Sequence, residues 1–349
     1  MNQVLPNNSD AILNAGSGEK GNNHFSFVIL TYNEEVHLPR LLRSIEGLDA
    51  SVYVLDSGST DLTVKIAEAY GAKVLCHPFE NHPKQWDYAL KAFRIASPWT
   101  IGLDADQVVS EELFKKLQGF SSTSVPANVN GIYFNRKNYF KGKWIKHGGY
   151  FPKFLLKMFR TSEGYSDLNE NMDHRFIVPG RTVIWQDGYL IEENTKENRI
   201  SFWIEKHNRY SEQIAVEELE RQMNIRHQTI APKIFGSPDE KIAYLKSYWW
   251  RMPLYLRPVL YFSYRYFVKL GILDGKQGFV FHFLQGFWFR LIVDIKIEEK
   301  KNDIRRAEEQ RFELIKKEIK KKESSGREVE RMGAGSTSTE SSIPLLAAK

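Results

Sequence analysis

Hydrophobic and polar positions along residues 25–106 alternate in blocks that predict strands and helices in turn. Short unbroken apolar runs are typical of strands buried on both faces. They are separated by segments whose apolar residues recur every three or four positions, as on one helix face. The predicted strands are 25–30, 51–56, 72–77 and 99–106, and the predicted helices are 37–48, 61–71 and 86–96. This order predicts an α/β fold with a parallel sheet covered on both faces.

Beyond Ser110 the alternation is looser, and the chain changes character twice. Three further strands are predicted at 130–140, 153–159 and 181–187, followed by a helix at 201–223. Residues 247–297 are rich in aromatic and basic side chains and predict two helices joined by a turn at 271–278, and 298–331 is a charged helical stretch. The two ends, 1–23 and 332–349, lack apolar periodicity and predict disorder.

Composition and charge narrow the class of protein. With 42% hydrophobic residues the chain can bury a large core, and its single cysteine, Cys76, excludes an internal disulfide framework and a cysteine-based zinc site. The formal net charge of +6 suits nucleotides, nucleic acid or an anionic membrane surface as partners. We expect neither a secretory signal nor a spanning helix, because the nearest apolar stretch, from Gly278, is interrupted by His282, Gln285 and Arg290.

Polar clusters follow three of the predicted strands at their carboxyl ends. The sequence reads TYNEE at 31–35, DSGSTD at 56–61 and DAD at 104–106. In open parallel sheets, ligands bind outside the carboxyl ends of the strands, and a strand-to-helix turn offers backbone N–H groups to a nucleotide. Taken singly, the first two clusters are equally explained as helix caps and turns. Three clusters at successive strand ends favour a ligand site.

Asp104 and Asp106 form the most informative of these clusters. Two like charges at the end of an apolar strand repel each other, so a partner of opposite charge is expected. Mg²⁺ and Mn²⁺ take oxygen ligands, typically one or two carboxylates together with substrate phosphates. If the strand continues to residue 106, its alternation points both carboxylates the same way. An acidic turn without a ligand is the alternative.

The order TYNEE, DSGSTD, HPKQWDYAL and LDAD resembles the nucleotide-sugar domain of family 2 glycosyltransferases with the GT-A fold. The whole chain further resembles bacterial members that build lipopolysaccharide core, capsule or exopolysaccharide. The resemblance implies a GT-A nucleotide-sugar-binding domain at 24–235, with a nucleotide-binding half at 24–110 and an acceptor half at 111–235. An amphipathic aromatic and basic region at 236–297 follows it, before the charged helix and the tail.

Family resemblance also implies an inverting, metal-dependent transfer from a nucleotide-sugar donor, and it suggests the donor contacts. Asp106 is expected to bind Mg²⁺ or Mn²⁺, with Asp104 near the metal, ribose and diphosphate. The remaining residues implied to line the nucleotide site are Thr31, Asn33, Glu35, Asp56, Lys84 and Gln85. The family often has a basic residue after that Gln, whereas this chain has Trp86.

A proton acceptor for the acceptor hydroxyl is expected well downstream of the DAD cluster. The stretch DLNENMDHRF, at 167–176, offers several candidates. By its position before the predicted strand at 176–180, Asp173 is favoured as the base, with Glu170 second. His174 is a candidate for positioning the acceptor or the diphosphate. A solvated acidic loop without a catalytic role is the alternative for each of them.

The aromatic and basic segment suggests contact with a membrane surface. Seven Lys or Arg and two Asp lie between residues 247 and 297, and the basic residues flank long apolar faces. Such faces suit the bilayer interface, where anionic lipid adds about 1 kcal/mol per basic residue. We therefore expect a lipid-linked saccharide acceptor and a peripheral location at the inner face of the cytoplasmic membrane. A helical hairpin packed on the catalytic domain or on a second subunit is the alternative.

Other functions fit the sequence less well. Nucleic-acid binding is not expected, because the basic residues accompany apolar faces rather than a hydrated groove. A nucleotidyltransferase acting on sugar phosphates usually carries a Gly-rich, basic phosphate loop near its start, and TYNEE is acidic. A non-catalytic nucleotide-sugar-binding module would be expected to lack the two acids. The sequence leaves the donor, the acceptor and the oligomeric state open.

Overall fold

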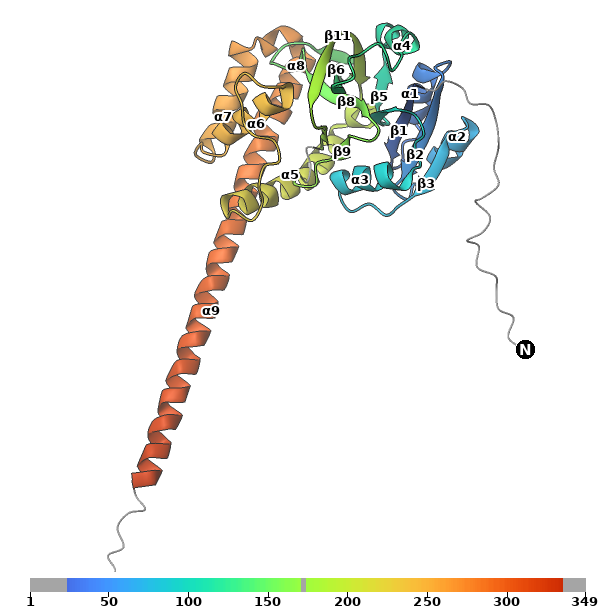
Figure 1. Cartoon of the computed structure of the whole chain (residues 1–349). Helices are drawn as coiled ribbons and strands as arrows, with labels where there is room; N and C mark the ends of the chain where they lie inside the picture. The colour runs from blue at the N-terminus through green and yellow to red at the C-terminus, as the bar shows by residue number, and fades with distance from the viewer. Residues whose placement is uncertain (1–23, 171–173, 335–349) are drawn as a thin grey trace, which may run out of the picture. The chain divides into compact units, whose positions relative to one another are not determined.

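A computed structural model describes residues 24–170 and 174–334, with side chains up to residue 320. Contacts divide the chain into two units, Met1–Asp294 and Ile295–Lys349. Within the described part of the first unit, nine strands form one sheet in the order β3-β2-β1-β4-β8-β6-β11-β5, with β7 paired to β6 (Figure 1). The predicted ends, 1–23 and 335–349, lie outside the described residues.

The first half of the sheet is the predicted parallel one. It comprises β1 (Phe25–Thr31), β2 (Ala50–Asp56), β3 (Lys73–Cys76) and β4 (Trp99–Asp104), joined by α1 (Leu38–Ile45), α2 (Thr63–Ala69) and α3 (His82–Ala92). Alternate strand residues feed two cores. Those around Phe27 and Val54 pack with α1, α2 and a further helix, α4 (Glu111–Gln118), whereas those around Val28 and Leu55 pack with α3. The helices therefore cover both faces, and the α/β fold class is confirmed.

Two boundaries differ from the sequence prediction in ways that affect the site. Helix α3 begins at His82 rather than Trp86, because Asn81 caps it by accepting a hydrogen bond from the Lys84 amide. Strand β4 ends at Asp104, so Asp106 lies in the turn to β5 (Gln107–Val109). Strand alternation therefore does not align the two carboxylates, and that expectation was wrong.

The second half of the sheet mixes directions. Strand β8 (Phe154–Arg160) runs antiparallel to β4 and to β6 (Val129–Phe140), while β11 (Arg181–Glu192) runs parallel to β6 and antiparallel to β5. The remaining elements of this half are β7 (Lys143–Ile145), β9 (Tyr165–Ser166), β10 (Phe176–Ile177), η1 (Thr195–Asn198), α5 (Ile200–Gln222) and α6 (Pro238–Trp249). The three predicted strands and the predicted helix at 201–223 are confirmed.

Residues 256–288 form the helical hairpin that the sequence predicts. It consists of α7 (Leu256–Ser263), η2 (Tyr264–Val268), η3 (Gly271–Asp274), α8 (Gly275–His282) and η4 (Phe283–Trp288). Buried Asp274 accepts hydrogen bonds from the backbone of Lys146 and His147, and Arg265 donates to the Gly148 carbonyl at 2.6 Å. The hairpin is thereby attached to the loop that follows β7.

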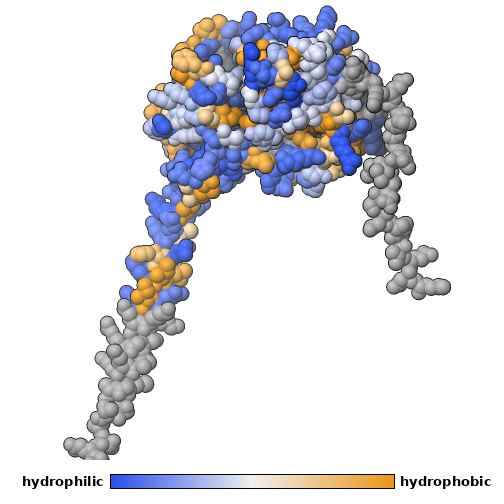
Figure 2. All heavy atoms as spheres, viewed as in Figure 1, coloured by the Kyte–Doolittle hydropathy of each residue, from blue (hydrophilic) through white to orange (hydrophobic). Residues whose placement is uncertain are grey.

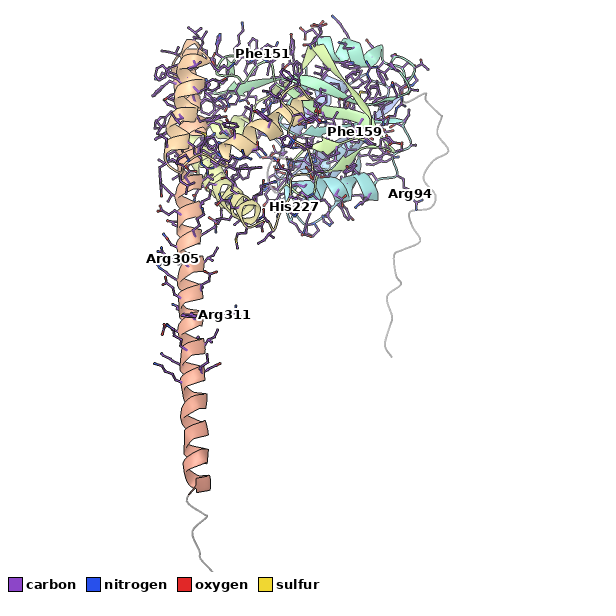
Figure 3. All side chains as sticks on the ribbon, turned by 60° about the vertical axis from the view of Figure 1, so that its left-hand side comes forward. Arg94, Phe151, Phe159, His227, Arg305 and Arg311 are labelled. Carbon is purple, nitrogen blue, oxygen red and sulfur yellow. The ribbon has the colours of Figure 1, made fainter. Side chains whose placement is uncertain are left out.

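A long helix, α9 (Phe289–Ala334), begins in the first unit and makes up the described part of the second. Side chains from 303 to 320 are exposed, and Arg305 and Arg311 project from the helix (Figure 3). By length and mean hydropathy, Gly271–Lys320 passes a test for a membrane-spanning helix, which the sequence prediction did not expect. The most apolar window of this stretch is 39% buried within the protein.

Candidate active site

A cleft of about 240 Å³ opens beside the end of β4. Its wall combines α3, β4, β6, β8, β11, α6 and the segment at 174–176. The lining residues are His82, Asp104, Gln107, Arg136, Lys153, Leu155, Leu156, Lys157, His174, Arg175, Phe176, Glu192, Asp239 and Ile242. Four of them are Lys or Arg and three are Asp or Glu, which makes the cleft a polar site with both signs of charge.

Asp104 is held as an anion at one end of this cleft. Its Oδ2 accepts from Lys157 Nζ at 3.0 Å, and His82 Nε2 lies 3.2 Å from Oδ1. Burial alone would raise the pKa of the Asp104 carboxyl, but Lys157 and His82 outweigh burial and hold that pKa well below its usual range. Asp104 is therefore ionised at neutral pH, with one oxygen bound to a lysine.

Asp106 has the opposite electrostatic environment. Its carboxylate accepts a hydrogen bond from Asn194 Nδ2 at 3.2 Å, and its backbone carbonyl accepts from the Glu193 amide. Burial and the charge of Glu192 raise the pKa of the Asp106 carboxyl to about 7, with Lys206 acting against them. An added positive charge at this carboxylate would relieve the repulsion.

A divalent metal ion fits this set of donors. Among the residues that the structure describes, no group of three or more His, Cys, Asp or Glu is arranged to hold a metal ion. Mg²⁺ sites, however, commonly use one or two carboxylates and complete their coordination with substrate phosphates and water. Asp106, crowded by negative charge, suits such a ligand better than Asp104, which already has Lys157 as a partner.

The polar loops after β1 and β2 lie side by side and are joined by hydrogen bonds. Strand pairing places Thr31 opposite Asp56 and Leu30 opposite Asp104, so the three predicted clusters meet at one sheet edge. Asn33, at a φ of +52°, donates its amide to Ser59 and accepts from the Thr60 amide. Glu35 accepts a hydrogen bond from the Leu62 amide. This hydrogen bond is exposed and joins the same two loops.

Asp56 is largely occupied by its own loop. Its carboxylate is 1% exposed and accepts from Thr31 Oγ1 at 2.8 Å, Gly58 N at 2.9 Å, Ser59 N at 2.7 Å and Ser59 Oγ at 2.5 Å. These four hydrogen bonds set the shape of the loop. A direct contact of Asp56 or Thr31 with a nucleoside stays a prediction.

The helix α3 contributes two predicted residues that behave differently. Gln85 is buried and donates to Ser57 Oγ and to the His77 carbonyl, both at 3.0 Å, so it ties α3 to the loop after β2. Lys84 is exposed and pairs with Glu80 at 2.5 Å. Trp86, where the family often has a basic residue, is fully buried, and its Nε1 lies 3.2 Å from His82 Nε2.

The segment at 167–176 reaches the cleft through His174 and Arg175. His174 stacks on Trp86, its Nε2 has no hydrogen-bond partner among the residues that the structure describes, and burial lowers the pKa of its imidazole well below the usual range. Glu170 does not line the cleft. It is 4% exposed and pairs with Arg175, Arg221 and Lys246 at 3.4–3.6 Å, while burial raises the pKa of its carboxyl to about 7. Asp173 lies outside the described residues.

Several cleft residues were not identified from the sequence. Arg136 on β6 donates to both oxygens of Glu192 on β11, at 2.7 and 2.9 Å, and Gln107 links Glu192 to the Asp104 amide. The others are His82, Lys153, Lys157, Arg175 and Asp239. They come from four separate segments, and no motif marks them. The one available signal was the position of His82 at the head of the HPKQW segment.

Comparison with known proteins assigns the domain to a family. The sequence model described as Glycosyl transferase family 2 matches residues 26–184, a span that contains the three polar loops and both acids of the DAD cluster. This chain carries a family 2 glycosyltransferase domain. The resemblance predicted from TYNEE, DSGSTD and LDAD is thereby confirmed.

Relatives of this family 2 domain are bacterial. An uncharacterised glycosyltransferase of Rickettsia typhi is 34% identical over 93 residues, which cover 27% of this chain and 31% of that protein. The match thus spans about a third of the length of the Rickettsia relatives. The lipopolysaccharide core biosynthesis glycosyltransferase LpsC of Rhizobium meliloti is 25% identical over 194 residues, 50% of this chain and 68% of that protein.

Among solved structures, glucosyl-3-phosphoglycerate synthase from Mycobacterium tuberculosis is similar over a smaller part. It was determined with Mn²⁺, uridine diphosphate and glucosyl-3-phosphoglycerate. The two chains are 21% identical, the similarity covers 34% of this chain and 44% of that one, and the TM-score is 0.27.

Proposed function

We propose that this chain is an inverting, metal-dependent glycosyltransferase that moves a sugar from a nucleotide-sugar donor to a lipid-linked saccharide. The observation that carries the proposal is the end of β4, where a lysine-bound Asp104 lines the cleft and a negatively crowded Asp106 lies in the turn directly after it, within a family 2 domain. A family name alone would not distinguish an enzyme from a binding module.

The donor side is assigned to the sheet edge formed by the three polar loops. The loops after β1 and β2 would hold the nucleoside, through Asn33 and Glu35 with Thr31, Asp56, Lys84 and Gln85 around them. Asp106, with Asp104, would hold the metal ion, which supplies Lewis-acid neutralisation of the diphosphate. The ion pair with Lys157 helps to keep the Asp104 carboxyl ionised at neutral pH.

The acceptor side is assigned to the part of the cleft reached by the 167–176 segment. In the reaction, the acceptor oxygen bonds to the donor sugar carbon as the bond from that carbon to the diphosphate oxygen breaks. The electron pair leaves with the nucleoside diphosphate, and the hydroxyl proton passes to a carboxylate. Asp173 remains the proposed base and Glu170 the second candidate. His174, which lines the cleft and is neutral, is proposed to position the acceptor or the diphosphate.

The pathway is proposed from the relatives and from the surface of the hairpin. LpsC, a lipopolysaccharide core glycosyltransferase, matches half of this chain, so bacterial surface-polysaccharide synthesis is the expected setting. Lipid-linked acceptors of this kind are presented at a membrane.

A donor screen tests the proposed function. The purified chain is incubated with a panel of nucleotide sugars, including uridine diphosphate glucose, in Mn²⁺ or Mg²⁺ and with truncated-core lipopolysaccharide as acceptor. We expect release of nucleoside diphosphate with one donor, increased by the acceptor and stopped by excess chelator. Absence of release with every donor, under conditions where the chain is folded, contradicts the proposal.

The helical hairpin is the surface proposed to meet the membrane. Exposed large hydrophobic residues gather between 255 and 283, namely Tyr255, Leu256, Val259, Leu260, Tyr264, Phe267, Val268, Leu270, Ile272, Leu273, Phe279 and Phe283. Figure 2 shows hydrophobic residues at the surface where Figure 1 places α7 and α8. Lys269 and Lys276 are exposed beside them, while the hairpin's acid, Asp274, is buried. This combination supports peripheral contact with an anionic bilayer.

We expect Phe267→Asp and Leu273→Asp each to weaken binding to vesicles of phosphatidylethanolamine and phosphatidylglycerol by roughly tenfold or more, because each removes an exposed apolar side chain worth about 1.5–3 kcal/mol when buried. Flotation of the protein with the vesicles measures binding. Phe79→Asp is the matched control, since Phe79 is 54% exposed on the loop before α3. Equal loss in the control, or no binding by the unmodified chain, contradicts membrane contact through the hairpin.

A further inference from the structure

Asp239 is an acid of the cleft that the sequence did not single out. It lies in the first turn of α6 and is 9% exposed. Its Oδ2 accepts a hydrogen bond from the hydroxyl of Tyr133, on β6, at 2.7 Å. Asp239 also lines the cleft, so its carboxylate borders the space that a bound molecule would fill.

The second oxygen, Oδ1, has a more distant partner than Oδ2. Arg175 Nη1 lies 4.0 Å from Oδ1, beyond hydrogen-bond distance. Burial raises the pKa of the Asp239 carboxyl, while Tyr133 and Arg175 act against burial. Among the described residues the Asp239 carboxylate accepts one side-chain hydrogen bond, whereas two ionised oxygens offer about four lone-pair sites.

The sheet places Asp239 on the side of the cleft away from the donor loops. In the strand order β1-β4-β8-β6, Tyr133 lies two strands beyond β4, which ends in Asp104. Neighbouring strands are about 4.8 Å apart, so Tyr133 stands about 10 Å from the donor end of the cleft. A donor sugar between these points would leave the acceptor next to Asp239.

We propose that Asp239, held in place by Tyr133, binds a hydroxyl group of the acceptor saccharide. The inference rests on the proposed glycosyltransferase function and adds a specificity-determining residue to its acceptor side. A sugar hydroxyl donates to the carboxylate oxygen, and Leu155 and Ile242 on the same wall offer apolar surface to the sugar ring.

A purely structural role for Asp239 at the start of α6 would not explain its hydrogen bond from Tyr133 or its position in the cleft wall. Acids are favoured in a first helical turn. In α6, however, Ser237 and Glu240 already form a reciprocal capping box. Capping requires neither the hydrogen bond from Tyr133 nor a place in the cleft wall.

The test compares Asp239→Asn with the unmodified chain, using the donor found in the screen and truncated-core lipopolysaccharide as acceptor. Asn keeps the shape and can still accept from Tyr133. We expect the KM for the acceptor to rise roughly tenfold to hundredfold, as for loss of a hydrogen bond to a charged group. The KM for the donor, and the slow release of nucleoside diphosphate without acceptor, are expected to stay unchanged. At saturating acceptor the rate should recover.

Two further variants separate binding from folding. Tyr133→Phe leaves the carboxylate but frees it to move, so a smaller rise in acceptor KM is expected. Glu240→Gln is the same acid-to-amide change one residue away; it removes the ion pair with Lys233 and does not touch the cleft, so acceptor KM should not change.

An unchanged acceptor KM in Asp239→Asn overturns the inference, as does an equal rise in Glu240→Gln. A fall in kcat with unchanged acceptor KM also overturns it, because binding would then not be the role. If the unmodified chain transfers no sugar at all, the proposed function fails instead.

Discussion

Replacing Asp106 with Ala is expected to lower sugar transfer by about 10³-fold or more and to leave the fold intact. A metal ion that neutralises a leaving diphosphate contributes several kcal/mol, and each ~1.4 kcal/mol is a factor of ten in rate. The carboxylate accepts one side-chain hydrogen bond, from Asn194, and is repelled by Glu192, so its loss removes little that stabilises the protein. Nucleoside diphosphate release with Mn²⁺ or Mg²⁺ measures the rate, and circular dichroism checks the fold.

Glu111→Ala is the matched control for this variant. Its carboxylate is 78% exposed and pairs with Lys115 within the exposed face of α4, so removing it deletes one acid without touching the cleft. We expect full activity. Full activity of Asp106→Ala, or of the unmodified chain in excess chelator, would show that Asp106 does not hold a catalytic metal ion.

The donor edge of the sheet was predictable because its signals are local. Each apolar run of the first half sets one parallel strand, and the polar residues directly after it must then appear at the carboxyl edge. Thr31, Asp56 and Asp104 consequently meet there, as the strand register shows. The error over Asp106 has a local cause as well, since the sequence pattern did not reveal that β4 stops at Asp104.

The electrostatic state of these acids was not predictable in the same way. The sequence pattern does not distinguish the surroundings of Asp104 and Asp106, but Lys157 forms an ion pair with Asp104, whereas the charge of Glu192 raises the pKa of Asp106. Both neighbours come from strands more than 50 residues further along the chain. Long-range pairing of β8 and β11 with the sheet decides which carboxylate gains a cation, and hydrophobic periodicity carries no information about it.

The sequence also did not reveal which basic residues of the hairpin are buried. Its basic residues were interpreted together as a positive flank for a membrane, which suits exposed Lys269. Arg257 is different, because it is fully buried. Its Nε donates to Asp294 at 2.7 Å, its Nη2 donates to Glu218 at 2.8 Å, and its guanidinium lies over the Trp249 ring. One arginine of α7 thus joins α5, α6 and the start of α9.

Arg257→Ala is expected to lower the free energy of unfolding by about 3–5 kcal/mol, the usual effect of removing one partner from a buried ion pair. Asp294, fully buried, and Glu218 would be left facing each other without their cation. Urea unfolding followed by circular dichroism measures the change, with Arg251→Ala, an exposed site, as the unaffected control.

The triple replacement Arg257→Met, Glu218→Leu and Asp294→Leu should be more stable than Arg257→Ala, since it leaves no buried charge unpaired. A loss below about 1 kcal/mol in Arg257→Ala would mean that the cluster contributes no more than a surface ion pair. The position of the hairpin would then depend on its contacts with the loop after β7.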